Sequence, residues 1–418
     1  MKQKKLIAGA LCVAATLAAQ TVWGAGFGIY EGSSRGNAMG TEVTADPASP
    51  SVLYNNAAAM TELEGTQFEA GATFIRPSQT VTTRTPAGSV DNEAKSKWWT
   101  PPHAYATYQM NDKVWAGLGV FSRYGLGIEY DDDWAGRYNC QEATIQSIDI
   151  NPSVAFKGLD SLSLAAGLRA EWFEFELFKA LPTGTPFVDP DLQFHMKGDS
   201  WGIGYNLGAF YKATDWLSFG LAFDSEIEQE VEGDYDVNHP NPAVAGGEGS
   251  GDITTPALLR FGTSVKATEK LTVNAGLVYT MWSSYEELAI DFDPALLGQI
   301  PSSTTEKDWD DVFRYQLGLE YALNETWALR AGYIYDETPD PDSTVDYIVP
   351  ANDRDLFSLG VGYKKGNFSC DLSYTYLMIH DRDIAVSAER AALREGVLPG
   401  EFKDGDSHLI GVSVGYKL

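Results

Sequence analysis

Charged side chains occur at single positions within segments whose other residues are mostly apolar or small. A guanidinium or ammonium group that is shielded from water binds a carboxylate through strong charge-assisted hydrogen bonds. Such groups can also neutralise one another inside the protein, and the sequence leaves both interpretations open. The residues that share this property are Arg169, Glu171, Lys179, Arg260, Arg314, Glu320, Arg330 and Arg354. The candidate contacts for an acidic ligand are Lys179, Arg314, Arg330 and Arg354.

The histidines of the sequence give no motif for catalysis or metal binding. The five histidines have neither a Ser-His-Asp arrangement nor a metal-ligand spacing. Acidic clusters such as 131–133 lack the glycine and the ligand spacing of a calcium loop. With 58 acidic against 30 basic residues, the chain has the wrong charge to neutralise phosphates. We expect no enzyme activity, no metal, no cofactor and no nucleic-acid partner.

The elements that carry the charged residues alternate with a period of two. Large apolar residues alternate with small or polar ones in the segments 271–279, 327–335, 357–363 and 368–376. This is the period of a β-strand, in which successive side chains point to opposite faces. Because soluble sandwiches also alternate, the pattern predicts strands without showing which face meets water.

The connections between these segments fall into two classes. Short turns alternate with long acidic stretches, and this asymmetry is typical of an outer-membrane β-barrel. The segments predict an all-β transmembrane barrel of about 14 antiparallel strands, closed by pairing of the last strand with the first near Thr66. The short turns lie at 111–112, 158–161, 213–215, 268–270, 324–325 and 365–367, and the long stretches at 80–97, 128–141, 180–197, 233–252, 290–308, 338–353 and 381–404.

The first 24 residues have the features of a secretory signal peptide. Three lysines at 2, 4 and 5 precede an apolar run over 6–19, which is too short to span a bilayer. We therefore expect export to the outer membrane of a Gram-negative bacterium. The expected partners there are membrane lipid and lipopolysaccharide, with the barrel-assembly machinery acting during insertion.

The segment 25–65 does not alternate and is rich in Gly, Ala and Ser. A compact segment before a barrel most naturally occupies its lumen. Its sequence contains Phe27 after a glycine and, later, Asn55, Asn56 and Ala57 after a tyrosine. These features resemble the hatch of the FadL family of outer-membrane long-chain fatty acid and hydrocarbon transporters. We divide the chain into a signal peptide (1–24), a lumenal hatch (25–65) and a barrel (66–418).

The resemblance extends along the barrel through landmarks at 115–126, 151–156, 201–206 and 349–354. It implies a barrel of 14 strands whose third strand has a kink that opens a lateral gap in the wall. The residues at that position are Ser122, Arg123, Tyr124 and Gly125. Glycine inside a strand independently indicates a bulge or a bend.

The resemblance also assigns parts of the ligand path. Lys179 lies where members of the family place a basic contact to the ligand carboxylate. In the family, the loop that corresponds to 180–197, which includes Phe187 and Phe194 here, forms the first capture site together with the next long loop. One departure concerns Asn56, because the family motif has proline there and the fixed φ of proline is lost.

The sequence thus predicts passive transport of hydrophobic compounds, most of all long-chain fatty acids. The predicted steps are capture among extracellular loops, movement of the hatch, and lateral exit through the kinked third strand. Aromatic or other neutral hydrocarbons are the alternative substrates of the same route. A general porin or a structural barrel is the alternative from a different class.

Overall fold

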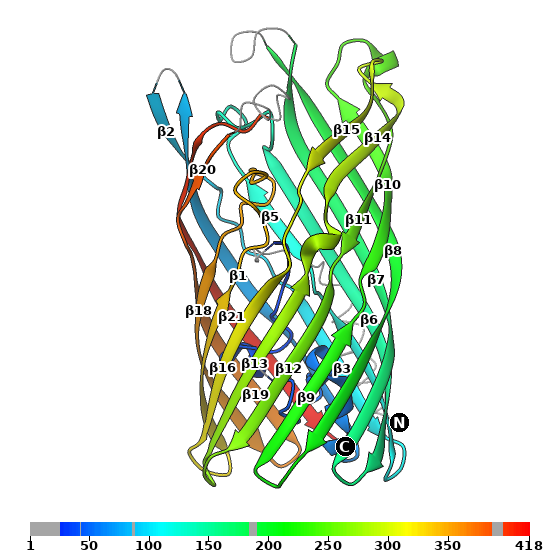
Figure 1. Ribbon diagram of the computed structural model, residues 1–418, viewed down its shortest axis with the longest axis vertical. Coiled ribbons are helices and arrows are strands. Elements are labelled where there is room, and N and C mark those ends of the chain that lie inside the picture. Colours follow the sequence, from blue (N-terminus) through cyan, green and yellow to red (C-terminus); the bar gives the residue numbers. More distant parts are fainter. Residues whose placement is uncertain (1–25, 42, 86–87, 184–189, 387–395) are drawn as a thin grey trace, which may run out of the picture.

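The computed structural model describes residues 26–41, 43–85, 88–183, 190–386 and 396–418. The predicted signal peptide and Phe187 lie outside these residues. The described chain forms one antiparallel sheet of 21 strand segments that closes into a barrel (Figure 1). The segments are β1 (Thr66–Thr85), β2 (Gly88–Glu93), β3 (Pro102–Gln109), β4 (Val114–Phe121), β5 (Gly125–Glu129), β6 (Glu142–Leu159), β7 (Leu162–Pro182), β8 (Asp191–Lys212), β9 (Leu217–Asp224), β10 (Ile227–Val237), β11 (Gly246–Thr255), β12 (Ala257–Lys266), β13 (Leu271–Met281), β14 (Glu287–Leu296), β15 (Ile300–Glu306), β16 (Val312–Ala322), β17 (Trp327–Asp336), β18 (Arg354–Lys365), β19 (Phe368–Ile379), β20 (Arg382–Ile384) and β21 (Gly400–Lys417).

Several consecutive segments are parts of one traverse of the wall, so the barrel has 14 strands. These pairs are β2 with β3, β4 with β5, β9 with β10, β11 with β12, β13 with β14, β15 with β16, and β19 with β20. The barrel closes where β1 pairs with β21, in a register that places Gln67 opposite Lys417 and Phe74 opposite Ile410. The first and last strands of the barrel are thus paired with each other, and the predicted fold class is confirmed.

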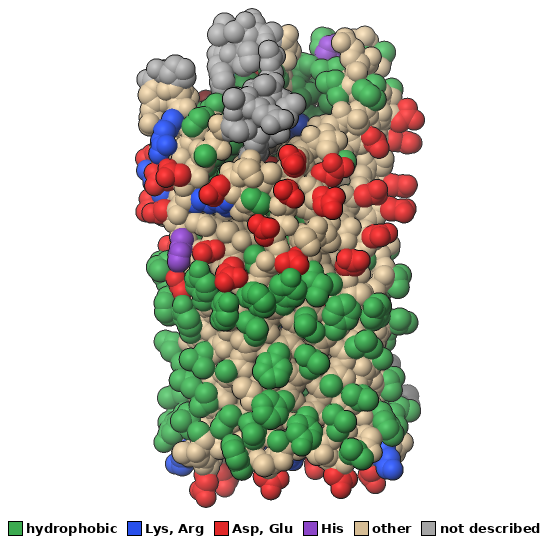
Figure 2. Space-filling view, in the orientation of Figure 1, with side chains coloured by type: hydrophobic (Ala, Val, Ile, Leu, Met, Phe, Trp, Pro, Cys, Tyr) green, Lys and Arg blue, Asp and Glu red, His purple; other side chains and the backbone are tan. Residues whose placement is uncertain are grey.

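The outer face of the barrel is apolar, which is the reverse of a water-soluble protein. On β8, Trp201, Ile203 and Leu207 are exposed, while Ser200 and Asn206 on the opposite face are buried. Figure 2 shows apolar side chains in a broad belt across the lower part of the visible face, with acidic side chains above it. A lipid-facing surface explains this belt, because hydrocarbon replaces water as its solvent.

The connections follow the predicted asymmetry. The short turns at 110–113, 160–161, 213–216, 267–270, 323–326 and 366–367 join strands at the lower end of the barrel in Figure 1. At the other end, β7 and β8 extend together far above the apolar belt, in a register that reaches Pro182 opposite Asp191. At the upper end, the strands thus extend beyond the apolar belt and carry side chains on the extracellular side.

The N-terminal segment lies inside the lower part of the barrel (Figure 1). Its helices are α2 (Ser34–Ala38), α3 (Val52–Asn55) and the 3₁₀ helix η1 (Ala57–Glu62). Two more 3₁₀ helices lie between strands, η2 (Pro242–Val244) between β10 and β11, and η3 (Trp282–Ser284) between β13 and β14. Helix α2 contacts β17, β18, β19 and β21, whereas η1 contacts β4, β6, β7 and β8. Among the described residues, no helix is long and apolar enough to cross a membrane.

Asn56 fixes the turn at which the family motif has proline. Its side-chain carbonyl accepts a hydrogen bond from Ala58 N at 3.1 Å and so caps η1. Its amide group donates to Thr44 O and to Ala209 O, both at 3.0 Å. Three hydrogen bonds thus replace the steric constraint of a proline ring, and one of them ties the segment to β8.

Candidate functional site

The third strand of the wall is divided into β4 and β5, and residues 122–124 lie between the two segments. Segments β4 and β5 both pair with β6, where Phe121 lies opposite Asp149 and Gly125 lies opposite Gln146. Four residue steps on the third strand therefore face three on β6, which is the extra residue of a β-bulge. The bulge comprises 122–124, whose side chains are all buried.

Neighbouring side chains and backbone hold the kink in place. Ser147 Oγ accepts a hydrogen bond from Tyr124 N and donates one to Tyr124 O, both at 3.0 Å. On the other edge, Ile29 N donates to Arg123 O at 2.7 Å and Gly125 N donates to Phe27 O at 2.8 Å. Residues 26–31, which we name the strap, are therefore joined to the kink through an isolated antiparallel bridge between Gly28 and Tyr124.

The strap lies where the wall loses a strand partner. Pairing of β3 with β4 ends at His103 opposite Phe121. The chain before β3 pairs with β1 instead, through the bridge between Trp99 and Ile75. The ring of Trp99 covers Gly127 so closely that a Cβ atom at Gly127 would lie 2.1 Å from it. The strap and this ring close the space beside the kink.

Phe27 anchors the strap in a group of aromatic rings. Its side chain is completely buried, and its ring contacts five others from four parts of the wall. Most of these contacts are edge-to-face, the arrangement that the aromatic quadrupole favours. The ring centroids lie 4.7 Å away for Trp282, 5.6 Å for Tyr285, 5.8 Å for Tyr124 and Trp309, and 6.5 Å for Phe173.

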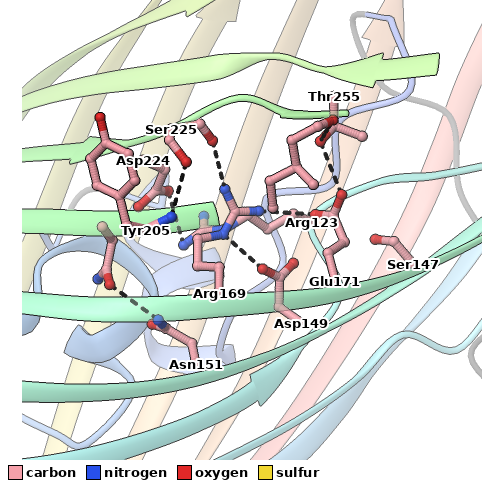
Figure 3. Close-up of polar contacts among 12 residues, drawn as sticks. Arg123, Ser147, Asp149, Asn151, Arg169, Glu171, Tyr205, Asp224, Ser225 and Thr255 are labelled. Atoms are coloured by element: carbon pink, nitrogen blue, oxygen red, sulfur yellow. Dashed lines mark hydrogen bonds and ion pairs between the residues drawn. The ribbon is translucent and has the colours of Figure 1, made fainter. Parts of the chain in front are cut away.

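Arg123 connects the kink to the rest of the lumen (Figure 3). Its guanidinium donates to Tyr54 O at 2.8 Å and lies 3.1 Å from a carboxylate oxygen of Asp224. It also lies over the rings of Tyr54 and Phe121, at 4.5 and 4.8 Å from their centroids. Asp224 in turn binds Arg260 at 2.7 Å. One kink residue thus links the N-terminal segment with β9 and β12.

A second buried group of charges stands behind the kink (Figure 3). Arg169 binds Asp149 at 2.7 Å and Glu171 at 2.9 Å, and it donates to Ser225 O at 3.1 Å. Arg169, Glu171 and Arg260 were expected inside, and all three are buried. Together with Arg123, Asp149 and Asp224, they give three positive and three negative charges. A balanced, hydrogen-bonded group of this kind positions the wall.

Two of the predicted ligand contacts lie in the upper part of the lumen. The ammonium nitrogen of Lys179 is 5.6 Å from the centroid of the Phe194 ring. Phe194 is buried beside Tyr235 and Phe292 in an apolar cluster of the extended walls. Among the described residues, no carboxylate lies within ion-pair distance of Lys179. This pair places a cation beside an apolar surface, and such a surface is complementary to a carboxylate that is attached to an apolar chain.

The remaining three predicted contacts separate into two clusters. Arg330 belongs to a latch cluster, in which it binds Glu320 at 2.7 Å and Asp371 at 2.6 Å. From α2, Arg35 joins this cluster by binding Glu320 at 3.2 Å and Asp46 at 2.7 Å. Arg35, Glu320, Arg330 and Asp371 line a cavity of about 470 Å³ between the N-terminal segment and the wall.

Arg314 and Arg354 belong to an arginine row, in which Asp336 lies between them. Arg314 faces Asp336 across β16 and β17, and Asp336 faces Arg354 across β17 and β18. Arg354 forms an ion pair with Asp336 and donates to the hydroxyl of Tyr30 at 2.9 Å. Arg314 stacks on the ring of Tyr30 at 3.5 Å. No carboxylate among the described residues lies within 4 Å of Arg314, and its buried Nε has no hydrogen-bond partner.

The lumen beneath the strap is nearly filled. A cavity of about 20 Å³ remains there, which is space for one water molecule. Its lining includes Arg123, Arg260, Arg314, Tyr54 and Trp282. A long hydrophobic ligand therefore cannot enter this region unless the strap moves.

Sequence reasoning missed Ser147, Tyr30 and Asp336. Ser147 and Asp149 are two residues apart on β6, so the alternation predicts that both side chains point into the lumen. The alternation does not predict that Ser147 contacts the kink. Tyr30 and Asp336 meet across 306 residues of sequence, and periodicity carries no signal for such a contact. Among the described residues, no group of three or more His, Cys, Asp or Glu could hold a metal ion.

Comparison with known proteins agrees with this geometry. The family model described as outer membrane protein transport protein (OMPP1/FadL/TodX) matches residues 15–418. The chain belongs to the FadL family. The long-chain fatty acid transport protein of Salmonella typhi is 26% identical over 452 residues, covering 100% of both chains.

Solved structures of FadL-family proteins share the fold. A Pseudomonas aeruginosa FadL homologue superimposes with a TM-score of 0.81 at 20% identity, covering 94% of this chain and 99% of the other. The Ralstonia pickettii toluene transporter TbuX gives a TM-score of 0.71 at 18% identity, covering 92% and 98%. This FadL-family protein is therefore a Gram-negative outer-membrane barrel that transports hydrophobic small molecules and is not an enzyme.

Proposed function

We propose that this protein carries long-chain fatty acids across the outer membrane by a passive route. The ligand is captured beside Lys179 and Phe194 at the upper walls. It then displaces the strap, the first part of a lumenal hatch formed by residues 25–65. It leaves sideways through the kink at 122–125.

The observation that carries this proposal is the unpaired guanidinium of Arg314 next to the strap. A buried cation without a carboxylate partner favours an anionic ligand, because burial makes an uncompensated charge costly. The neighbouring aromatic rings around Phe27 supply an apolar surface for the tail. A carboxylate with a long hydrocarbon chain satisfies both environments.

Neutral aromatic hydrocarbons are a second candidate, favoured by the ring cluster alone. Once Phe27 leaves, the rings of Trp282, Trp309 and Tyr285 offer a site of suitable shape and polarity for another aromatic molecule. In this alternative the arginine row has only a structural role.

Uptake of radiolabelled oleate and toluene tests the substrate. The assay uses a strain that lacks its own transporters, with and without this protein. Uptake of oleate that depends on the protein supports the proposal. Uptake of toluene alone would assign the protein to neutral hydrocarbons. If neither compound is taken up, transport of both substrate classes is contradicted.

A cross-link between strap and kink tests the route. Gly28 and Tyr124 form an isolated antiparallel bridge, and the flanking hydrogen bonds identify them as a non-hydrogen-bonded pair. Such pairs have the short Cα separation that a disulfide needs. Gly28→Cys with Tyr124→Cys should abolish oleate uptake when oxidised and restore it after reduction, while each single variant keeps uptake. Full uptake through the oxidised double variant would exclude this route.

A further inference from the structure

Tyr30 is the strap residue that contacts the whole arginine row. Its hydroxyl donates to Asp336 Oδ2 at 2.9 Å and accepts a hydrogen bond from Arg354 Nη2 at 2.9 Å. Its ring lies 3.5 Å below the guanidinium carbon of Arg314. One side chain thus occupies the approach to both arginines.

Among the residues that the structure describes, Asp336 is the one carboxylate of the wall that forms an ion pair with the arginine row. Arg314, Asp336 and Arg354 are cross-strand neighbours on three adjacent strands, and all three are buried. Arg354 forms the ion pair with Asp336, whereas Arg314 lies opposite Asp336 in the register without an ion pair to it. The strap also brings the carboxyl group of Glu31 near both arginines, since Arg354 and Arg314 act electrostatically on it. Glu31 is buried and accepts a hydrogen bond from Tyr30 N at 2.8 Å. When the strap leaves, the row loses this carboxyl group together with the hydroxyl.

We propose that Tyr30 occupies the place of an acidic headgroup on Arg314 and Arg354, and that it sets the selectivity between acidic and neutral ligands. This inference rests on the proposed function. A fatty acid must replace the Tyr30 hydroxyl in order to bring its carboxylate to the row. A neutral ligand needs only the space of Phe27, three residues earlier in the strap, and leaves Tyr30 where it is.

The energetic reason is that the two hydrogen bonds of the hydroxyl involve charged partners. Such bonds are stronger than neutral ones, so breaking them opposes the binding of an acid. Tyr30→Phe removes the competing hydroxyl and keeps the ring below Arg314. The variant should therefore bind acids more tightly without a change in its fold.

The test compares oleate with methyl oleate, which has the same chain and no charge. Binding is measured by titration calorimetry on the purified full-length protein in detergent. Tyr30→Phe should lower the Kd for oleate about tenfold, from the strength of a hydrogen bond to a charged group, and change the Kd for methyl oleate less than about twofold. Tyr30→Leu, which also removes the ring, should lower the Kd for oleate at least as much.

Tyr347→Phe is the matched control. It deletes another buried tyrosine hydroxyl, one that donates to Leu398 O at 3.0 Å in the extracellular part of the protein. It should leave both affinities unchanged.

Equal gains for both ligands in Tyr30→Phe would overturn the inference, since the strap would then move as one unit for either ligand. Unchanged oleate binding would overturn it as well, while the proposed function would stand. Wild-type protein that binds neither ligand would overturn the proposed function and the inference with it.

Discussion

The latch cluster and the arginine row use the same residue type on the same inner face, yet they are neutralised differently. In the latch cluster, Arg330 has two carboxylate partners, and Glu320 also binds Arg35 from the N-terminal segment. In the row, Arg314 has no carboxylate within ion-pair distance among the described residues. The position of an arginine on the inner face of a barrel strand therefore does not determine its role. An arginine with enough carboxylate partners stabilises the structure, whereas an arginine without them is available to bind an anionic ligand.

The largest effect should come from breaking the latch cluster. Arg330→Met leaves the buried carboxylate of Asp371 without its guanidinium partner, and loss of one partner in a buried ion pair costs about 3–5 kcal/mol. The free energy of unfolding, measured by urea denaturation in detergent, should fall by about that amount. Arg314→Met, the matched change in the row, should lower it by less than about 1 kcal/mol, because it breaks no ion pair.

Similar losses for the two variants would erase the distinction between the clusters. A larger loss for Arg314→Met would reverse it and identify the row as the structural element.

A smaller but more specific effect is expected from Arg314→Gln. This substitution removes the unpaired cation and keeps a polar side chain of similar length. The affinity for oleate should fall about tenfold, because a hydrogen bond between charged groups contributes about 1.5–3 kcal/mol. Binding of toluene should not change. Both are measured by calorimetry on the purified protein.

The control for Arg314→Gln is Arg84→Gln. Arg84 forms an exposed ion pair with Asp383 at the extracellular end, far from the row in the sheet. Loss of toluene binding together with oleate binding in Arg314→Gln would show that the row shapes the lumen in general and does not recognise a carboxylate.

Much of the fold was predictable because the alternation of apolar with small or polar residues along a strand is a local pattern. Alternation placed Arg314, Arg330 and Arg354 on the inner face, and glycine inside the third strand indicated the bend. These inferences need only the period of two and the chemistry of single residues. The pairing of the last strand with the first also follows from alternation at both ends of the barrel.

The division between latch and row was not predictable, since it depends on contacts between distant parts of the chain. Glu320 faces Arg330 in the next strand and could have been inferred from the register of the hairpin. Asp371 and Arg35 reach the same cluster from β19 and from α2, and no local pattern indicates this. The same holds for Tyr30, whose partner Asp336 lies on β17.

The smallest expected effect concerns the carboxyl group of Glu31, which the strap brings near the arginine row. Burial raises the pKa of the Glu31 carboxyl above its ordinary value of 4.5, and this outweighs the opposing effects of the Tyr30 backbone hydrogen bond, Arg354 and Arg314. With the strap open, Glu31 is in water and its pKa is ordinary. The closed strap therefore binds the proton more tightly than the open one. By linkage, closure is stabilised as the pH falls from above the raised pKa to about 4.5, and it is weakened as the pH rises through the same range.

Hydrogen exchange at Ile29 measures this equilibrium, because Ile29 N donates to Arg123 O only while the strap is closed. After correction for the intrinsic rate, exchange should be a few-fold faster above the raised pKa than near pH 5, following the linkage relation. Glu31→Gln should exchange slowly at both pH values, and the exposed control Glu64→Gln should behave as wild type. Faster exchange in acid would mean that Glu31 stabilises the closed strap as an ionised carboxylate. The closed strap would then already supply the arginine row with a stabilising negative charge. In that case, the free energy that drives a fatty acid into the row would have to come from burial of its hydrocarbon tail.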